Sequence, residues 1–177
     1  AVILLVEPNP VITTQPTSDA ICENGFHIFT AGASGPAGMN YQWYVDRNDG
    51  FGFVALVDGD GFHTGSNTEQ LAISNAAVTM DGWQYQFEVS TACMPVRSAA
   101  VTLTVWDNPV PSITPLTAHT YYPLICGGEV LTLDGSPVGG SGSYTSHAWS
   151  GAIGPLSSTT SQVVDFETTI KGNYALA

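Results

Sequence analysis

The sequence predicts an all-β protein built from two small antiparallel sandwiches in tandem, and three observations lead to that prediction. Residues 41–45 and 81–89 alternate apolar and polar side chains, which is the period of a strand with one buried face. Clusters of Gly, Pro, Asn, Asp and Ser recur about every 8–12 residues, as in short-stranded sandwiches. Helical periodicity never lasts more than two turns, and only residues 76–81 indicate a short helical turn.

The first domain is expected to cover residues 11–106. An edge strand begins near Pro16, because an edge tolerates a proline. Ala31 and Trp43 mark the next two buried strands. Trp43 is the largest apolar side chain in the first half of the chain, so it is the expected centre of the core. The alternating segment 81–89 then supplies four large apolar side chains on one face.

An internal repeat links the two ends of this domain. Residues 1–6 form an apolar strand followed by Asn-Pro, and residues 100–105 repeat that pattern. The repeat predicts that residues 1–10 are the closing strand of a preceding module and its linker. Alternatively, residues 1–6 are a donor strand that completes the second domain of a neighbouring copy.

The order of Ala31, Trp43, Asp81, Tyr85 and Phe87 resembles an immunoglobulin-like domain. In such domains a strand-B cysteine, a strand-C tryptophan and a strand-F Asp-x-x-x-Tyr-x-Cys motif occupy these places. The resemblance implies that Tyr85 is the corner tyrosine. Both cysteine positions are apolar here, which we interpret as a volume-conserving replacement of the buried disulfide.

More narrowly, residues 12–16, 22–25 and 41–43, with the tail at 90–93, resemble the tandem immunoglobulin-like repeats of very large Bacteroidota surface proteins. The resemblance implies a disulfide between Cys22 and Cys93. It also implies a similarity to the gliding-motility adhesins and to other large cell-surface adhesins that the type IX pathway exports.

The second expected domain covers residues 107–177. Trp149 and Tyr174 are its predicted core residues, and the Gly-x-Tyr that ends in Tyr174 resembles the PKD-like repeats of the same giant proteins. In that family Gly-x-Tyr begins the penultimate strand. The resemblance therefore implies that this sandwich is incomplete and that Cys126 has its partner beyond the sequence.

The charge and the cysteines of the sequence limit which partners the protein can bind and in which cell compartment it can lie. Three Lys and Arg residues stand against fifteen Asp and Glu residues, which argues against nucleic acid and against an anionic membrane surface. No apolar run approaches the length of a membrane span, so membrane insertion is not expected. A disulfide would require an oxidising compartment, so the predicted location is extracellular or on the cell surface.

Catalytic motifs are not visible, so the sequence predicts a protein that is not an enzyme and has no cofactor. Asp58 and Asp60 begin like a calcium loop, but the later ligands of such a loop are missing, and Asp-Gly pairs are common turn residues. We therefore favour a turn over a weak calcium site. The four histidines are scattered, which argues against zinc.

Trp106 is the remaining functional hint, because its counterpart in the repeat is Glu7. It is expected to pack between domains or to stack on a sugar. The predicted function is a non-catalytic structural or adhesive segment of a long surface protein, with neighbouring repeats, identical subunits or surface glycans as partners. The alternatives are a filament subunit assembled by strand donation through residues 1–6, and a carbohydrate-binding module of a secreted enzyme.

Overall fold

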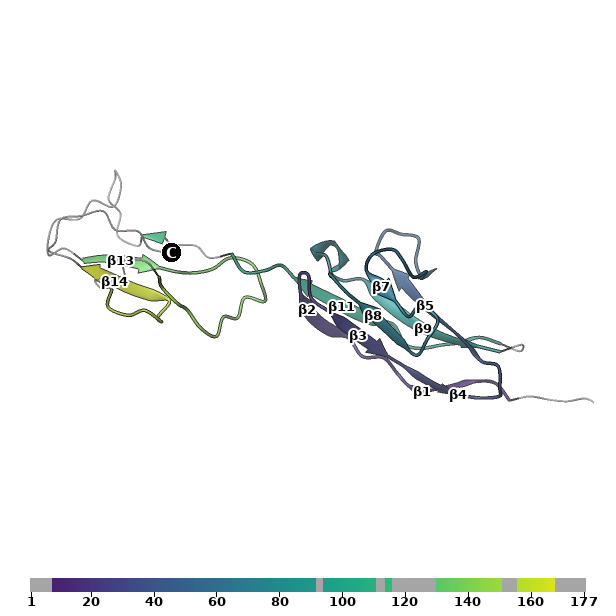
Figure 1. Cartoon of the computed structure of the whole chain (residues 1–177). Coiled ribbons are helices and arrows are strands. Elements are labelled where there is room, and N and C mark those ends of the chain that lie inside the picture. Colours follow the sequence, from purple (N-terminus) through teal and green to yellow (C-terminus); the bar gives the residue numbers. More distant parts are fainter. Residues whose placement is uncertain (1–7, 92–93, 111–113, 116–129, 151–155, 168–177) are drawn as a thin grey trace, which may run out of the picture. The chain divides into compact units, whose positions relative to one another are not determined.

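The computed structural model describes residues 8–91, 94–110, 114–115, 130–150 and 156–167. The chain divides into two compact units, Ala1–Asp107 and Asn108–Ala177, and each is described here by itself. Both described parts consist of strands, with one short 3-10 turn in the first unit (Figure 1). The sequence-based prediction of an all-β fold is confirmed.

The first unit holds most of the strands. They are β1 Val11–Thr14, β2 Asp19–Cys22, β3 His27–Thr30, β4 Gly32–Ser34, β5 Asn40–Asp46, β6 Val54–Ala55, β7 His63–Thr64, β8 Gln70–Ile73, β9 Gln84–Ser90, β10 Val96–Arg97 and β11 Val101–Trp106. The 3-10 turn η1 spans Val78–Met80, where the sequence indicated a short helical turn.

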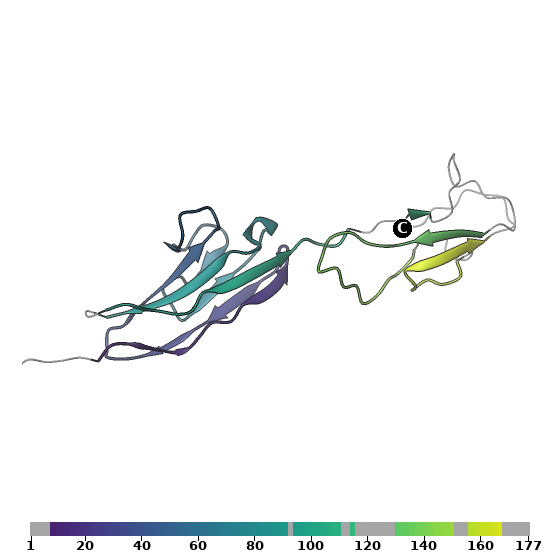
Figure 2. The same ribbon diagram turned by 180° about the vertical axis from the view of Figure 1, so that it is seen from behind.

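Two sheets enclose the core of this unit. One has the order β2-β11-β9-β5-β6, with β10 also on β9, and the other has the order β3-β8-β7. A separate pair joins β1 to β4. Opposite views in Figures 1 and 2 show β2 beside β11 and β1 beside β4.

The pairing of β2 corrects the expectation of purely antiparallel sandwiches, because β2 runs parallel to β11. The physical reason lies in Pro16, which is buried between β1 and β2. A proline has no amide hydrogen and a fixed φ, so it interrupts a ladder. The edge strand is therefore split, and its two halves join different sheets.

The core residues predicted for this unit are buried. Trp43 is fully buried, and its indole N–H donates to the Thr68 carbonyl at 2.8 Å. Ala31, Tyr85 and Phe87 are also buried. Phe87 lies directly opposite Trp43 across β5 and β9, with ring centroids 5.2 Å apart. A phenyl ring thus fills the space beside the tryptophan.

Pro10 is the last residue of the predicted linker over residues 1–10. Pro10 is among the most buried residues of the first unit. It packs so closely on Gly35 that a Cβ there would lie 3.0 Å from the Pro10 Cα. Pro10 therefore belongs to the folded unit, because it fills the space that Gly35 leaves. Residues 1–7, with the predicted closing strand, lie outside the described residues.

The second unit contains β12 Thr114–Pro115, β13 Val130–Asp134 and β14 Val163–Glu167 as one sheet in that order. Trp149 is buried with Leu131, Leu133 and Val164, and its indole N–H donates to the Ser161 carbonyl at 2.8 Å. Each unit therefore holds a buried tryptophan by a backbone carbonyl. The predicted core residue Tyr174 and the predicted unpaired Cys126 lie outside the described residues.

Candidate functional site

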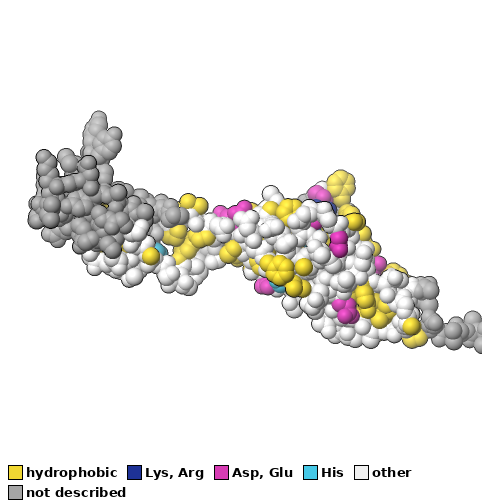
Figure 3. Space-filling model, in the orientation of Figure 1, with side chains coloured by type: hydrophobic (Ala, Val, Ile, Leu, Met, Phe, Trp, Pro, Cys, Tyr) yellow, Lys and Arg dark blue, Asp and Glu magenta, His cyan; other side chains and the backbone are white. Residues whose placement is uncertain are grey.

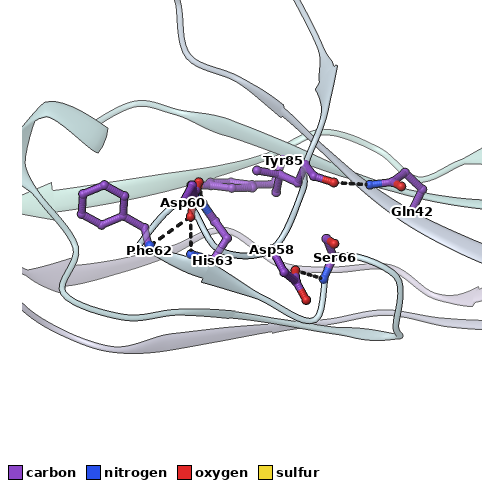
Figure 4. A network of polar contacts seen from close by, with 8 residues as sticks. Gln42, Asp58, Asp60, Phe62, His63, Ser66 and Tyr85 are labelled. Carbon is purple, nitrogen blue, oxygen red and sulfur yellow. Dashed lines mark hydrogen bonds and ion pairs between the residues drawn. The ribbon is translucent and has the colours of Figure 1, made fainter.

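A polar chain of three side chains, of which His63 and Tyr85 are buried and Asp60 is exposed, crosses the first unit from one sheet to the other. His63 on β7 is 2 % exposed. Its Nδ1 lies 2.6 Å from the Asp60 carboxylate, and its Nε2 lies 3.1 Å from the Tyr85 hydroxyl on β9. Figure 4 shows Asp60 at the outer end of this chain, close to Phe62 and His63. The three side chains tie the two sheets together through hydrogen bonds.

The chemistry of the three side chains determines which group donates in each of these hydrogen bonds. An ionised carboxylate only accepts, so the His63 Nδ1 carries a proton and donates to Asp60. In the neutral imidazole the Nε2 is then an acceptor, and the Tyr85 hydroxyl donates to it. Asp60 also accepts from the backbone amides of Phe62 and His63, at 3.0 and 2.8 Å. The chain is thus satisfied at every described position.

Burial and hydrogen bonding act on this chain in opposite directions. Burial by itself raises the pKa of Asp60, but the bonds from His63 and the Phe62 amide outweigh it, so that pKa lies below its usual value. Burial raises the pKa of Tyr85 far above that of a free tyrosine. The carboxylate therefore stays ionised and the hydroxyl stays protonated across the neutral range. That is the state of a structural brace, since neither group is poised to exchange protons.

The sequence missed the partner of Tyr85. A corner tyrosine would donate to the backbone a few residues upstream. Here the hydroxyl reaches His63 on the opposite sheet, and Asp81 instead accepts from the Val105 amide at 2.9 Å. The spacing of Asp60 three residues before His63 was a local signal for their contact. The contact with Tyr85 had none, because it depends on how the sheets face each other.

The two aspartates considered for calcium serve as turn acceptors. Asp58 accepts from the Gly65 and Ser66 amides at 3.1 and 2.9 Å, as Figure 4 shows for Ser66. These bonds, that from Ser66 first, hold the pKa of Asp58 below its usual value. The carboxylates of Asp58 and Asp60 are therefore directed to protein donors. Among the described residues, no three His, Cys, Asp or Glu side chains are grouped to hold a metal ion.

A pocket of about 460 Å³ opens at one end of the β5–β9 pair. Asn40 and Ser90 lie opposite each other on the two strands, and Asn67 reaches in from the loop after β7. Tyr44 adds aromatic surface and Glu88 adds a carboxylate, while the Tyr41 ring packs on the core side against Phe87, with ring centroids 5.5 Å apart. Its volume is within the usual range for a small-ligand site. Sequence reasoning missed this pocket, because three separate segments form it.

An ion pair borders the pocket. The Arg97 Nε donates to Glu88 at 2.7 Å, and the Tyr44 hydroxyl donates to the same carboxylate at 3.3 Å. The Arg97 guanidinium lies 4.0 Å from the centre of the Tyr44 ring. The hydrogen bond that Arg97 donates to Glu88 is the main cause that raises the pKa of Arg97. The carboxylate is thus neutralised inside the protein.

Cys22 and Trp106 lie together at the end of the β2–β11 pair. They face each other in the parallel register, and the Trp106 side chain is partly exposed at 38 %. Cys22 is a free, exposed cysteine. The structure therefore gives no support to the predicted disulfide with Cys93, which itself lies outside the described residues.

Comparison with known proteins defines the fold class. No protein-family model matches the chain, and no curated protein matches it. Among solved structures, a Dscam structure on isoform specificity covers 94 % of the chain with 18 % identity and a TM-score of 0.52. The four N-terminal immunoglobulin domains of Dscam1 isoform 4.44 cover 95 % with 17 % identity and a TM-score of 0.51. The aligned region spans 40 % of each Dscam chain.

These similarities and the strand order show an immunoglobulin-like β-sandwich fold. In the first unit β5 and β9 pair around Trp43, β2 runs parallel to β11, and β3 and β8 form the opposite sheet. The fold alone does not define the activity. In the described part of the chain, no helix has the length and apolar character needed to cross a membrane.

Proposed function

We propose that this chain is a non-catalytic structural and adhesive segment of a long extracellular surface protein. The observation that carries the proposal is the parallel pairing of β2, the second strand of the first sandwich, with β11, its last strand. When the two ends of a chain are pulled apart, parallel neighbours slide past each other. All their hydrogen bonds are then loaded at once, so the unit resists tension.

Side-chain bonds extend this parallel pair beyond the strands. The Thr102 amide donates to the Ser18 hydroxyl at 2.9 Å, and the Ala99 amide donates to the Gln15 side-chain oxygen at 3.0 Å. At the other end the Glu23 amide donates to the Trp106 carbonyl at 2.6 Å. Residues 15–23 are thus fastened to residues 99–106 over their whole length. This arrangement suits a module that transmits force along an array.

The chemistry of the described side chains supports a non-catalytic role. The Asp60 carboxylate, the His63 imidazole and the Tyr85 hydroxyl are hydrogen-bonded to one another in a chain, and the free cysteine is exposed. On the face drawn in Figure 3, acidic side chains are scattered over the described residues and form no single patch. Calcium and the absence of a cofactor stay predictions. Three further points also stay predictions: that neighbouring repeats are partners, that the protein lies on the cell surface, and that it is one of the Bacteroidota adhesins exported by the type IX pathway.

Stretching single molecules with a force probe tests the mechanical proposal. The chain is linked between folded marker domains, and the unfolding force of the first unit is compared between the wild type and Ser18→Ala with Gln15→Ala. The double variant is expected to unfold at lower force. Asp49→Ala is the control, because the bond that it removes joins Asp49 to the Phe51 amide within a turn and involves neither β2 nor β11. Equal forces for all three proteins would contradict the role of the parallel pair.

Protease shaving of intact producing cells tests the location. We expect an antibody against the chain to label whole cells and the label to disappear after proteinase treatment. A chain that is protected until the cells are lysed would contradict the surface assignment. Donation of residues 1–6 lies outside the described residues and stays an alternative. Trp106 stays a candidate for interdomain packing or sugar stacking.

A further inference from the structure

We infer that the pocket at the end of the β5–β9 pair binds a neutral saccharide of one or two sugar units. The inference deepens the adhesive part of the proposed function and rests on it, since it names the class of ligand. Four features of the described residues lead to it: free hydrogen-bonding groups, a carboxylate whose charge is already paired, the aromatic surface of Tyr44 and a rigid frame.

The first feature is a set of uncommitted polar groups. Asn40, Asn67 and Ser90 line the pocket, and their side chains make no hydrogen bond within the described part of the chain. Each amide offers both donors and an acceptor, and the hydroxyl offers one donor and two lone pairs. A sugar hydroxyl also donates and accepts, so this set matches several adjacent hydroxyl groups.

The uncovered edge of β5 adds backbone groups to the set. In an antiparallel pair, successive residues point their backbone groups toward and away from the partner strand in turn. Trp43 points its groups away from β9, where its amide donates to the Ser66 carbonyl and its carbonyl accepts from the Leu56 amide. Tyr41, two residues earlier, points the same way. No hydrogen bond joins its outer amide and carbonyl to the described part of the chain.

The second feature decides between neutral and charged ligands. Glu88 is the charged residue of the lining, and Arg97 with Tyr44 already satisfies its carboxylate. An anionic ligand would meet this carboxylate without a free cation nearby. A cationic ligand would have to displace Arg97 from a short ion pair. A ligand without net charge faces neither cost.

The remaining features are the aromatic surface and the frame. Tyr44 presents aromatic surface beside the Arg97 guanidinium, and the C–H face of a sugar ring is complementary to such a surface. Asn67 is held in place from both sides, because Trp43 bonds to the Ser66 carbonyl before it and to the Thr68 carbonyl after it. A site held rigidly in advance binds with a smaller entropy cost. The pocket therefore has a fixed shape as well as matching chemistry.

The test uses the purified chain of residues 1–177 with defined probes. An array of neutral and acidic glycans identifies binders, and titration with neutral mono- and disaccharides followed by amide NMR locates them. We expect neutral glycans to bind and to shift the amide signals of Asn40, Asn67 and Ser90. Asn67→Ala and Ser90→Ala should each weaken binding about tenfold, the loss of one or two good hydrogen bonds. The sialylated and phosphorylated forms of the same glycans should bind more weakly.

Asn9→Ala is the matched control, because Asn9 is exposed and lies outside the pocket lining. It should leave the affinity within about twofold, and the melting temperatures of all variants should agree, since Asn67 and Ser90 form no side-chain bonds. The inference is overturned if no neutral glycan binds. It is also overturned if acidic glycans or extended peptides bind better, or if the variants at Asn67 and Ser90 bind as well as the control. Failure here would leave the force measurement unaffected, so the two proposals are distinguishable.

Discussion

The hydroxyl of Tyr85 is the most informative single group to remove. Tyr85→Phe keeps the ring that packs against Phe29, with centroids 5.1 Å apart, and deletes only the oxygen. No cavity of consequence is created, so packing is not the cause of any change. What remains is the His63 Nε2, buried and 3.1 Å from a position that no longer holds a donor.

The expected cost follows from that orphaned nitrogen. A buried polar atom left without its partner costs about 1–3 kcal/mol of unfolding free energy. With a central value of about 2 kcal/mol, a domain of this size loses about 8–16 °C of melting temperature. The chain that joins the two sheets is broken at the same time. We therefore expect the first unit to open at lower temperature, with the second unit unaffected.

Calorimetry and urea unfolding measure this change, with NMR assigning each transition to its unit. Tyr44→Phe is the matched control, because it deletes a hydroxyl whose 3.3 Å bond to Glu88 is partly exposed. That control should lose about 0.5 kcal/mol or less. If Tyr85→Phe loses no more than Tyr44→Phe, the buried chain contributes nothing and the reasoning fails.

The remaining predictions concern acid, alkali, thiols, packing and metal. The lowered pKa of Asp60 gives stability that is complete above about pH 4 and is lost as the pH falls through the pKa of Asp60 in the folded protein. Asp60→Asn should therefore flatten the acid side of a curve of stability against pH. The raised pKa of Tyr85 gives stability that is lost above about pH 10, which the alkaline side of the same curve measures. Cys22 should react with a thiol reagent in the folded protein, and Cys22→Ser should cost far less than the roughly 3–4 kcal/mol expected for a lost disulfide. Gly135→Ala should destabilise the second unit by about 1–3 kcal/mol, because the new Cβ would lie 2.9 Å from the Trp149 ring. EDTA should leave the melting temperature of the first unit unchanged within about 1 °C, and a larger drop would show that calcium contributes to its stability.

The strands around Trp43 and Tyr85 could be predicted from sequence, because alternation with period two is a local signal that burial imposes on each strand. The parallel pairing of β2 could not be predicted in this way. Pro16 indicated the start of an edge strand, but a proline does not say which sheet that strand will join. That choice depends on hydrogen-bond partners about eighty residues away, such as the pairing of Ser18 with Thr102.

The candidate site shows the same limit more strongly. Asn40, Asn67 and Ser90 are ordinary polar residues in their own segments, and only the fold brings them to one pocket. The predicted pairing of Cys22 came from a resemblance to other proteins, and the register places Cys22 beside Trp106 instead. Side chains that converge from distant segments leave no periodic trace in a single sequence. Sequence reasoning therefore located the core better than the site.

The split edge strand has a consequence for how the first unit opens. Because β1 is held by β4 and β2 is held by β11, the start of the chain has two independent attachments. Detachment of β1 would expose one side of β4, while the ladder along β11 stays closed. Hydrogen exchange of the backbone amides should therefore show weaker protection in β1, before Pro16, than in β2, after it. The reason is that β1 should open more often than β2.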